Sequence, residues 1–413
     1  MENPSSIHIE SLINNITSFL SGNVCKNISI VKANNENLAI NGELYFLPSF
    51  KVWKSVLKDT EKCYKNCATI FRYVLNNRNA ELNNKTDEEI ANQVLQLLIS
   101  SSRDWPTKIE KYSLEKERVC LFLQRAPLIE NSIKTAIVSK HNFGRTLSLN
   151  KVFNLKFVED KESELTTARL CLIQNVAEKV LNAHGCKLSE EQCDYKYVFT
   201  SKSQGNVEEH YKKCVCGVVK NTETKSKETR LTWQRYIQNK VRELKELNEH
   251  KYFEGQEFNA KSKDYFLENL AKATATFELL SVKVSRPVFI GCNFATDKNT
   301  TNTKGASFIL YNAARIATII EKYNSKSLKG EYPSLPCISN IDFSLLNQEE
   351  EWELVYNFII GYQDMLKDCL KYEPVFQINP QVICIFLSRL CQKFSIYYRR
   401  IRILTEAYEH LIP

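Results

Sequence analysis

The spacing of apolar residues changes along this chain of 413 residues, and that change limits the folds open to it. Up to about residue 287, short apolar runs typical of strands alternate with segments in which apolar residues recur every three or four positions, as they do in helices. From Gly305 onward the pattern is almost wholly helical, and prolines at 333, 336, 374 and 380 separate the segments. The pattern predicts an α+β multidomain chain with a helical C-terminal part.

Three domains are expected, because 413 residues exceed one ordinary core of about 150 residues. The first is an α+β module over residues 1–105, with helices at Ile9–Leu20, Val52–Leu75 and Asp87–Ser101. Asp87 is the expected N-cap of the third helix. The module should end at Trp105, because the residue before a proline disfavours helix.

The second domain is expected over residues 106–287, as a degenerate α/β domain of the nucleotide-binding type. Its helix Leu165–His184 should end at Gly185 and pack against a parallel sheet. Its expected strands are Val119–Gln124, Tyr195–Thr200 and Cys214–Lys220. The third domain, over residues 300–413, is expected to be an all-α bundle with helices at Ser307–Tyr323, Glu349–Tyr372 and Gln381–Tyr408.

No pattern of residues predicts catalysis, a cofactor or a metal. The 11 glycines form no phosphate-binding loop, and the six histidines fit no nucleophile–base set. A zinc site at His210, Cys214 and Cys216, with His184, Cys186 and Cys193 upstream, is a weak alternative, because its spacing matches no usual zinc motif. Cys214 and Cys216 would share one buried face of a strand, so packing is the favoured interpretation.

The chain should be cytoplasmic and should not enter a membrane. No apolar run approaches the ~18 residues of a membrane span, and the first residues show no secretory pattern. The 14 cysteines are then expected to be reduced thiols. A net charge of +8 permits a polyanionic partner without requiring one.

The last predicted helix is the most informative segment. Between Pro380 and Ile403 it holds five basic and no acidic residues. Arg389, Lys393 and Arg400 fall on one line, and Arg399 and Arg402 extend the positive surface. Beside them runs an apolar stripe that includes Phe386, Leu390 and Phe394, and we expect this stripe and Tyr311 in the core of the bundle. Basic side chains next to Tyr398 suit phosphate neutralisation with base stacking, whereas the alternative is a solvated basic face on a core helix.

The same helix resembles the anticodon-binding helix of arginyl-tRNA synthetases, the DALR domain, in the segments Arg389–Tyr398 and Arg402–Leu404. Lys304–Ala317 is similar to a second synthetase helix, and Thr167–Gly185 more weakly to a third. Through this likeness Lys304 and Arg315 become further candidates for tRNA binding.

Non-catalytic DALR anticodon-binding domain-containing proteins resemble the chain more closely, through segments such as Ala273–Leu280 and Asn340–Leu346. This resemblance implies a tRNA adaptor. Such a protein would recognise arginine tRNAs and hand them to a methyltransferase that makes 3-methylcytidine. Synthetase domains usually continue with a further helix, so the resemblance implies either a naturally short C-terminal domain or a fragment.

The chain departs from the synthetases in the two motifs that act on ATP when the amino acid is activated. Glu162–Leu165 stands in place of the HIGH box, and the loop Thr296–Lys304 lacks the KMSKS order. Both groups would be needed to neutralise transferring phosphates. A tRNA-binding adaptor without enzymatic activity is therefore the favoured hypothesis; the alternatives are an arginyl-tRNA synthetase and a scaffold that makes no RNA contact.

Overall fold

The computed structural model describes residues 9–23, 30–57, 67–78, 85–115, 117–145, 151–204, 210–248, 260–291, 304–401 and 403–404. Contacts divide the chain into two compact units. The first comprises Met1–Phe143 and Leu335–Gly361, and the second Gly144–Ser334 and Tyr362–Pro413. This division differs from the three expected domains, because no division falls near residue 105 and part of the helical C-terminal region joins the first unit.

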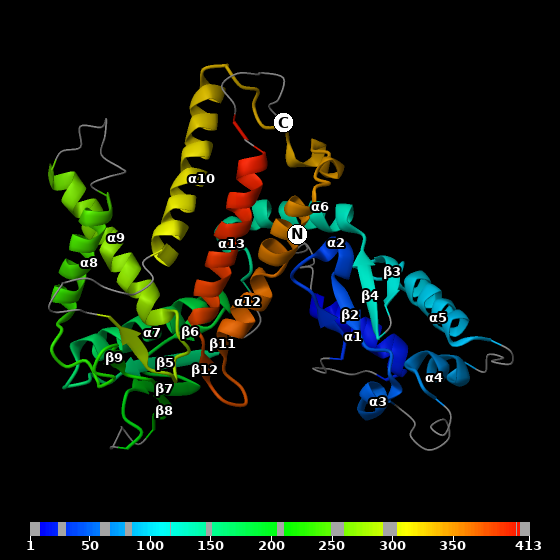
Figure 1. Ribbon diagram of the computed structural model, residues 1–413, viewed down its shortest axis with the longest axis horizontal. Coiled ribbons are helices and arrows are strands. Elements are labelled where there is room, and N and C mark those ends of the chain that lie inside the picture. The colour runs from blue at the N-terminus through cyan, green and yellow to red at the C-terminus, as the bar shows by residue number, and fades with distance from the viewer. Residues whose placement is uncertain are drawn as a thin grey trace. The chain divides into compact units, whose positions relative to one another are not determined.

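The first unit is an antiparallel sheet packed with helices (Figure 1). The strands run in the order β1-β2-β4-β3: β1 (Lys32–Ala33), β2 (Leu44–Phe46), β4 (Arg118–Leu123) and β3 (Ile109–Glu115). The α-helices are α1 (Ile9–Ser21), α2 (Leu38–Asn41), α3 (Phe50–Trp53), α4 (Ile70–Asn77), α5 (Asp87–Ser102), α6 (Arg125–Ser139) and α11 (Glu349–Leu354). The 3-10 turns are η1 (Lys54–Val56), η3 (Lys140–Asn142), η4 (Ile338–Asn340) and η5 (Phe343–Leu345), and η6 (Val355–Ile360) is a π-helix.

Several local predictions for this unit need correction. The helix expected over Val52–Leu75 is α3, a 3-10 turn and α4, with residues 58–66 outside the described residues. The N-cap of α5 is Thr86 and not Asp87, because Thr86 and Glu89 form a reciprocal capping box. The predicted strand Val119–Gln124 exists as β4, but it pairs antiparallel with β2 and β3 of the first sheet. An apolar run predicts that a strand is buried, but it does not show which strands pair with it.

Buried Glu43 connects the segment Leu335–Gly361 to the rest of the first unit. Its Oε1 accepts hydrogen bonds from Trp352 Nε1 at 2.7 Å and from Arg125 Nη2 at 2.9 Å, and its Oε2 accepts one from Leu123 N at 2.8 Å. Arg125 Nη1 also donates to Glu349 Oε2 at 2.5 Å. Trp352 is 1% exposed, so α11 belongs to the core of this unit.

The second unit contains a parallel sheet in the order β6-β5-β7-β8: β6 (Lys187–Leu188), β5 (Val152–Phe157), β7 (Tyr195–Thr200) and β8 (Lys212–Val215). Two smaller sheets pair β9 (Val219–Asn221) with β10 (Val288–Ile290) and β11 (Leu370–Lys371) with β12 (Gln377–Ile378). The helices are α7 (Glu164–Ala183), α8 (Trp233–Asn248), α9 (Ala260–Leu280), α10 (Lys304–Leu328), α12 (Tyr362–Cys369) and α13 (Gln381–Arg400).

The expected parallel sheet with a helix against it is present. The apolar side of α7 packs on Phe153, Leu155 and Phe199 of β5 and β7, and Gly185 follows the helix with φ of 74°. The single strand expected at Cys214–Lys220 is wrong, because β8 and β9 lie in different sheets. The chain turns between them at Gly217, where a Cβ atom would come within 2.2 Å of the Arg286 backbone.

The helical C-terminal region is less regular than expected. The helix expected over Glu349–Tyr372 is divided into α11, the π-helix η6 and α12, and the boundary between the units falls after Gly361. The last helix, α13, ends at Arg400, and residues 405–413 lie outside the described residues. Within the described part of the chain, no helix combines the length and the apolar character that a membrane crossing requires.

The expected core of this region is also wrong. Phe386, Leu390 and Phe394 are half-buried, and Tyr311 is 45% exposed. Cys384 and Cys391 are instead the buried positions of α13. The physical reason is that α10 is exposed along most of its length, so the apolar stripe of α13 is only partly enclosed.

Candidate nucleic-acid interface

Helices α10 and α13 lie side by side in the second unit (Figure 1). Asn312 of α10 is 1% exposed, and its Oδ1 accepts a hydrogen bond from Ser395 Oγ of α13 at 2.8 Å. Its Nδ2 donates to Phe308 O at 2.8 Å, so the buried amide is satisfied on both sides. At the start of α10, a Cβ atom on Gly305 would lie 2.7 Å from the Phe277 ring, so glycine permits the close approach of α9.

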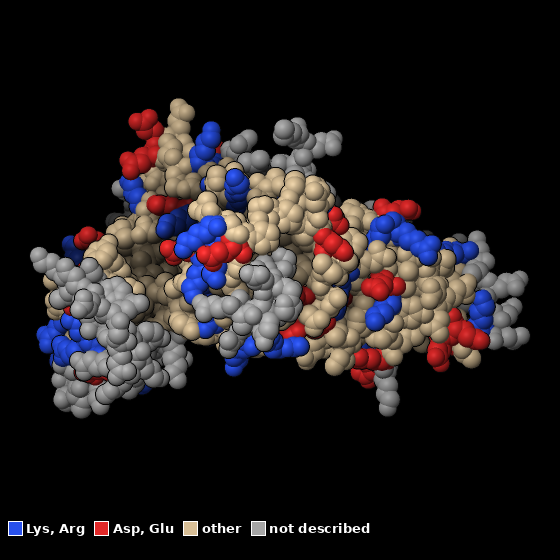
Figure 2. Space-filling model, turned by 90° about the horizontal axis from the view of Figure 1, so that it is seen from above, with Lys and Arg blue, Asp and Glu red and all other residues tan. Residues whose placement is uncertain are grey.

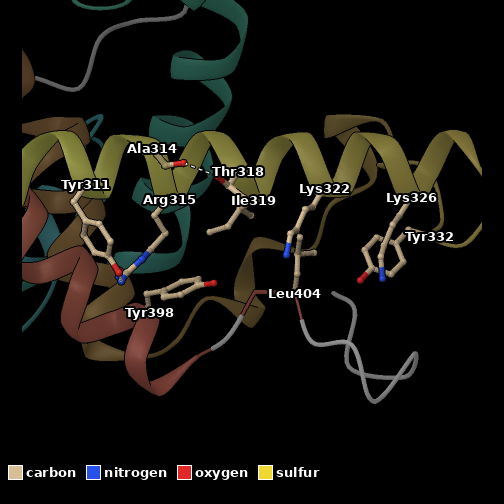
Figure 3. Close-up of a pocket in the computed structure, with 10 residues that line it drawn as sticks. All are labelled: Tyr311, Ala314, Arg315, Thr318, Ile319, Lys322, Lys326, Tyr332, Tyr398 and Leu404. Atoms are coloured by element: carbon tan, nitrogen blue, oxygen red, sulfur yellow. Dashed lines mark hydrogen bonds between the residues drawn. The ribbon is translucent and has the colours of Figure 1, made fainter. Parts of the chain in front are cut away.

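A groove of about 330 Å³ opens between these two helices (Figure 3). We call it the α10–α13 groove. Its floor and walls are formed by side chains of α10 with contributions from α13 and the segments that follow each helix. The lining residues are Tyr311, Ala314, Arg315, Thr318, Ile319, Lys322, Lys326, Tyr332, Tyr398 and Leu404. Basic and aromatic side chains therefore share one concave surface.

Arg315 connects the two helices at one end of the groove. Its guanidinium carbon lies 4.5 Å from the centroid of the Tyr311 ring and 4.9 Å from that of Tyr398 (Figure 3). Arg315 Nη2 also donates a hydrogen bond to the Tyr311 hydroxyl. Tyr398 in turn stacks on Phe394, with ring centroids 5.9 Å apart. A cation held against aromatic faces is a cation–π arrangement, which orders both rings and keeps the charge in the groove.

Two lysines continue the positive charge along α10. Lys322 and Lys326 follow Arg315 by seven and eleven positions, so all three lie on one side of the helix and line the groove. Lys326 Nζ lies 5.0 Å from the centroid of the Tyr332 ring and 3.9 Å from Glu331. Figure 2 shows basic side chains, with acidic ones among them, around the end of α10 that faces the viewer. The groove therefore has a positive but not exclusively positive border.

The structure brings together some of the predicted site residues. Arg315 and Tyr398 are in contact, and both line the groove. Arg389 and Lys393 are half-buried on α13 outside the groove lining, whereas Arg399 and Arg400 are exposed at its C-terminal end. Arg402 lies outside the described residues, and α10 begins at Lys304, whose side chain is not among those described.

Sequence reasoning missed Lys322, Lys326 and Tyr332. The two lysines could have been predicted, because they extend the line from Arg315 along a single predicted helix. Tyr332 could not have been predicted in this way, because it follows the helix. It reaches the groove only because the chain turns back after Gly330, which has φ of 74°. A second hollow, of about 1020 Å³ and lined partly by Phe277, Phe289 and Phe308, shares Tyr311 with the groove.

The carboxyl end of the parallel sheet is occupied by the chain's own charges. Asp160, after β5, is 4% exposed and accepts hydrogen bonds from Lys227 Nζ at 2.7 Å and Ser201 Oγ at 2.6 Å. Lys227 also pairs with Glu162 at 2.7 Å. Burial alone would raise the pKa of Asp160, but the hydrogen bonds from Lys227 and Ser201 outweigh it, and the pKa lies below the ordinary value. Lys227 is therefore held between two carboxylates of its own chain.

The zinc alternative finds no support in the described residues, where no three potential ligands gather. Cys216 is 2% exposed and Cys214 half-buried, and burial raises the pKa of each thiol to about 12. His184 Nε2 lies 3.2 Å from Leu366 O in the interior of the second unit. These groups are packed into the fold, and the two thiols keep their protons near neutral pH.

The residues that line the groove fall in a part of the chain that matches a known domain. Residues 309–412 match the model of the DALR anticodon binding domain. The DALR anticodon-binding domain-containing protein 3 of Danio rerio is 30% identical over 203 residues, which cover 48% of this chain and 35% of that protein. Its Mus musculus counterpart is 34% identical over 146 residues, covering 34% of this chain and 27% of that protein. The match thus spans about a third of the relatives' length or less.

Arginyl-tRNA synthetases are also similar. The arginine–tRNA ligase of Borrelia garinii is 28% identical over 136 residues, covering 33% of this chain and 20% of the ligase. The solved structure of Thermus thermophilus arginyl-tRNA synthetase superposes with a TM-score of 0.54 at 8% identity, covering 100% of this chain and 95% of that one. The expected resemblance and the α+β fold class are therefore confirmed.

Proposed function

We propose that this protein is a tRNA-binding adaptor that performs no chemistry of its own. The observation that carries the proposal is the α10–α13 groove, where Arg315 lies between Tyr311 and Tyr398 within a region that matches an anticodon-binding domain. Arg315, Lys322 and Lys326 supply positive charge for phosphates. Tyr311, which is 45% exposed, supplies a ring on which an unpaired base of an RNA loop stacks, whereas Tyr398 is already held between Arg315 and Phe394.

The groove suits single-stranded RNA better than a duplex. Stacking requires bases that are splayed out of a helix, which is the condition of an anticodon loop. Base–aromatic stacking contributes about 1–3 kcal/mol per base, so even one exposed tyrosine adds usefully to the charge attraction. Arg399 and Arg400, exposed at the end of α13, extend the same positive surface toward the rest of the RNA.

The absence of catalysis is part of the proposal. A synthetase must neutralise the phosphates of ATP in the transition state. Here Lys227, at the end of the sheet that follows β5, is held in ion pairs with Asp160 and Glu162. A lysine held by two carboxylates of its own chain is poorly placed to neutralise phosphates, which argues against the alternative of an arginine–tRNA ligase.

The proposal also specifies which RNA the protein binds and which enzyme receives that RNA. Similarity to arginine–tRNA ligases favours arginine tRNAs as the RNA. The family resemblance of segments such as Ala273–Leu280 and Asn340–Leu346 implies delivery of these tRNAs to a methyltransferase that forms 3-methylcytidine. The competing function is a scaffold in which the basic groove meets an acidic protein.

A charge-removal experiment tests the groove. The variant R315Q/K322Q/K326Q should bind arginine tRNA more weakly, and the slope of log K against log salt should fall by about 2, since each lost phosphate contact removes roughly 0.7–0.9. The control is K245Q/K272Q/K371Q, which removes the same charge from exposed lysines of the same unit that pair with neighbouring carboxylates. If the groove variant is folded and binds tRNA with unchanged affinity and slope, the scaffold function becomes the better one.

A further inference from the structure

The charged side chains that line the α10–α13 groove are all positive. The lining contains Arg315, Lys322 and Lys326, and none of its ten described residues is acidic. Figure 3 shows these three side chains pointing from α10 toward the side on which Tyr398 lies. Among the described residues, only Lys326 of the three pairs with a carboxylate, that of Glu331 at 3.9 Å. A ligand group that enters the groove therefore meets positive charge that the lining does not balance.

The tyrosine rings at one end of the groove already hold a cation. The guanidinium carbon of Arg315 lies 4.5 Å from the centroid of the Tyr311 ring and 4.9 Å from that of Tyr398. Tyr311 is 45% exposed, so its ring is the one that a base can reach. A ring attracts a cation through its quadrupole, but a second cation at the same ring is repelled by the first. A neutral base stacks on Tyr311 without this repulsion.

The arrangement is the opposite of an aromatic cage. Aromatic cages bind methylated cations because their ring faces are open to the ligand. Here Arg315 lies against the rings, and its Nη2 donates a hydrogen bond to the Tyr311 hydroxyl. The guanidinium of the protein therefore stands where a cage would hold the cation of its ligand. Phosphates and neutral bases fit this end of the groove, and a cationic base does not.

We propose that the α10–α13 groove selects RNA loops by the charge of a base: it accepts a neutral base and rejects one with a fixed positive charge. Methylation of cytosine at N3 creates such a base, because the methylated ring is a cation at neutral pH, where cytosine is neutral. The inference rests on the proposed function, in which the RNA passes to an enzyme that forms 3-methylcytidine. The groove then holds the unmodified loop more tightly than the methylated one, which favours release of the RNA after methylation.

The size of the effect follows from Coulomb's law. Two unit charges about 4 Å apart in bulk water repel each other by an energy that corresponds to roughly a five-fold change in Kd. Arg315 is half-buried, where the repulsion at a given distance exceeds that in bulk water, whereas a base stacked on Tyr311 lies somewhat farther away than 4 Å. We therefore expect binding to weaken by about 3- to 10-fold at 0.1 M salt, and the difference to shrink as added salt screens the charges.

Four synthetic arginine anticodon stem-loops test the inference on the native protein. They differ in one loop base, which is cytidine, 3-methylcytidine, uridine or 3-methyluridine. The last of these carries the same methyl group at N3 but no charge, so it separates charge from size and from the loss of the N3 edge. 3-Methylcytidine should bind about 3- to 10-fold more weakly than cytidine, whereas 3-methyluridine should bind within about two-fold of uridine.

A fifth RNA controls for the total charge of the stem-loop. It carries cytidine in the loop and 3-methylcytidine in an unpaired 3′ overhang, and it should bind like the unmodified RNA. Equal weakening by the overhang and by the loop base would overturn the inference, because the groove would then not be where the charge is sensed.

The variant R315Q tests whether Arg315 is the source of the selection. It should bind every stem-loop more weakly, and it should lose most of the difference between cytidine and 3-methylcytidine, because the charge beside Tyr311 is gone. The K245Q/K272Q/K371Q control should keep the full difference. A folded R315Q protein that still discriminates like the native one would overturn the assignment to this end of the groove.

The outcomes for the native protein separate this inference from the groove function. Equal binding of the cytidine and 3-methylcytidine loops, equal losses from both methylated bases, or tighter binding of 3-methylcytidine would each overturn the inference and leave the groove function standing. The third result would mean that the tyrosines act as an aromatic cage after all. If none of the stem-loops binds, the groove function fails, and this inference fails with it.

Discussion

Replacing Glu43 by alanine should destabilise the first unit by about 3–5 kcal/mol, the range for removing one partner of a buried ion pair. The magnitude follows from the groups left behind. Leu123 N and Trp352 Nε1 lose their acceptor in the interior, at about 1–3 kcal/mol each. Arg125 is 27% exposed at its side chain and keeps Glu349 at 2.5 Å, so it contributes less than a fully buried cation would.

The assay is denaturation followed by tryptophan fluorescence. Trp53, Trp105 and Trp352 lie in the first unit and Trp233 in the second, so the signal reports mainly on the first. Amide exchange over residues 349–360 should also accelerate, because Trp352 loses its anchor. A loss below about 1 kcal/mol, with unchanged exchange in that segment, would refute the placement of Glu43 at the centre of this network.

The E43Q variant serves as the matched comparison. Glutamine keeps one oxygen for Arg125 and Trp352 but offers no acceptor to Leu123 N, so the expected loss is about 1–3 kcal/mol. Burial raises the pKa of Glu43 above 4.5 in the folded state. The folded state then binds the proton more tightly than the unfolded state, so Glu43 favours folding at low pH and this contribution is lost as pH rises from about 4.5 through the raised pKa. E43Q should remove that component of the pH dependence.

Two further outcomes are expected for the second unit. Pyrophosphate exchange with arginine and ATP should stay at background even when tRNA is present, because Glu162–Leu165 stands in place of the HIGH box and the sequence Thr296–Lys304 lacks the KMSKS order; robust exchange would overturn the non-catalytic proposal. R315K should keep the salt slope of tRNA binding while lowering affinity by about 0.5–2 kcal/mol, because lysine retains the charge but not the planar contact with Tyr311 and Tyr398; unchanged affinity would show that stacking by Arg315 is unimportant.

Much of the secondary structure could be predicted from apolar periodicity. The helices at Ile9–Ser21 and Glu164–Ala183 and the strand Tyr195–Thr200 are long or regular enough for one pattern to dominate. The pattern could not place β4, because its apolar run fits any buried strand and only its pairing with β2 and β3 decides the sheet. Nor could it show that Trp352 packs beside Glu43, more than three hundred residues away in sequence.

The candidate site was predictable in part, and for a physical reason. Arg315 was identified through family resemblance and Tyr398 through its place beside the basic stripe of the last helix, and they meet because α10 and α13 pack together around Asn312. The line of Arg389 and Lys393 was chosen from helical spacing alone. Helical spacing shows that two side chains lie on the same side of a helix, but it does not show whether that side meets solvent, another helix or a groove. Tyr332 depends on the turn after α10, which local spacing does not predict.

Ultraviolet cross-linking of the native protein to arginine tRNA, with the linked peptides identified by mass spectrometry, tests the central claim most directly. The groove places Tyr311, Tyr332 and Tyr398 beside the positive charge that would hold the RNA. The account predicts cross-links in peptides that contain these tyrosines, and their loss when excess anticodon stem-loop competes. Efficient cross-linking confined to other parts of the chain, or no cross-linking at concentrations that saturate binding, would contradict it.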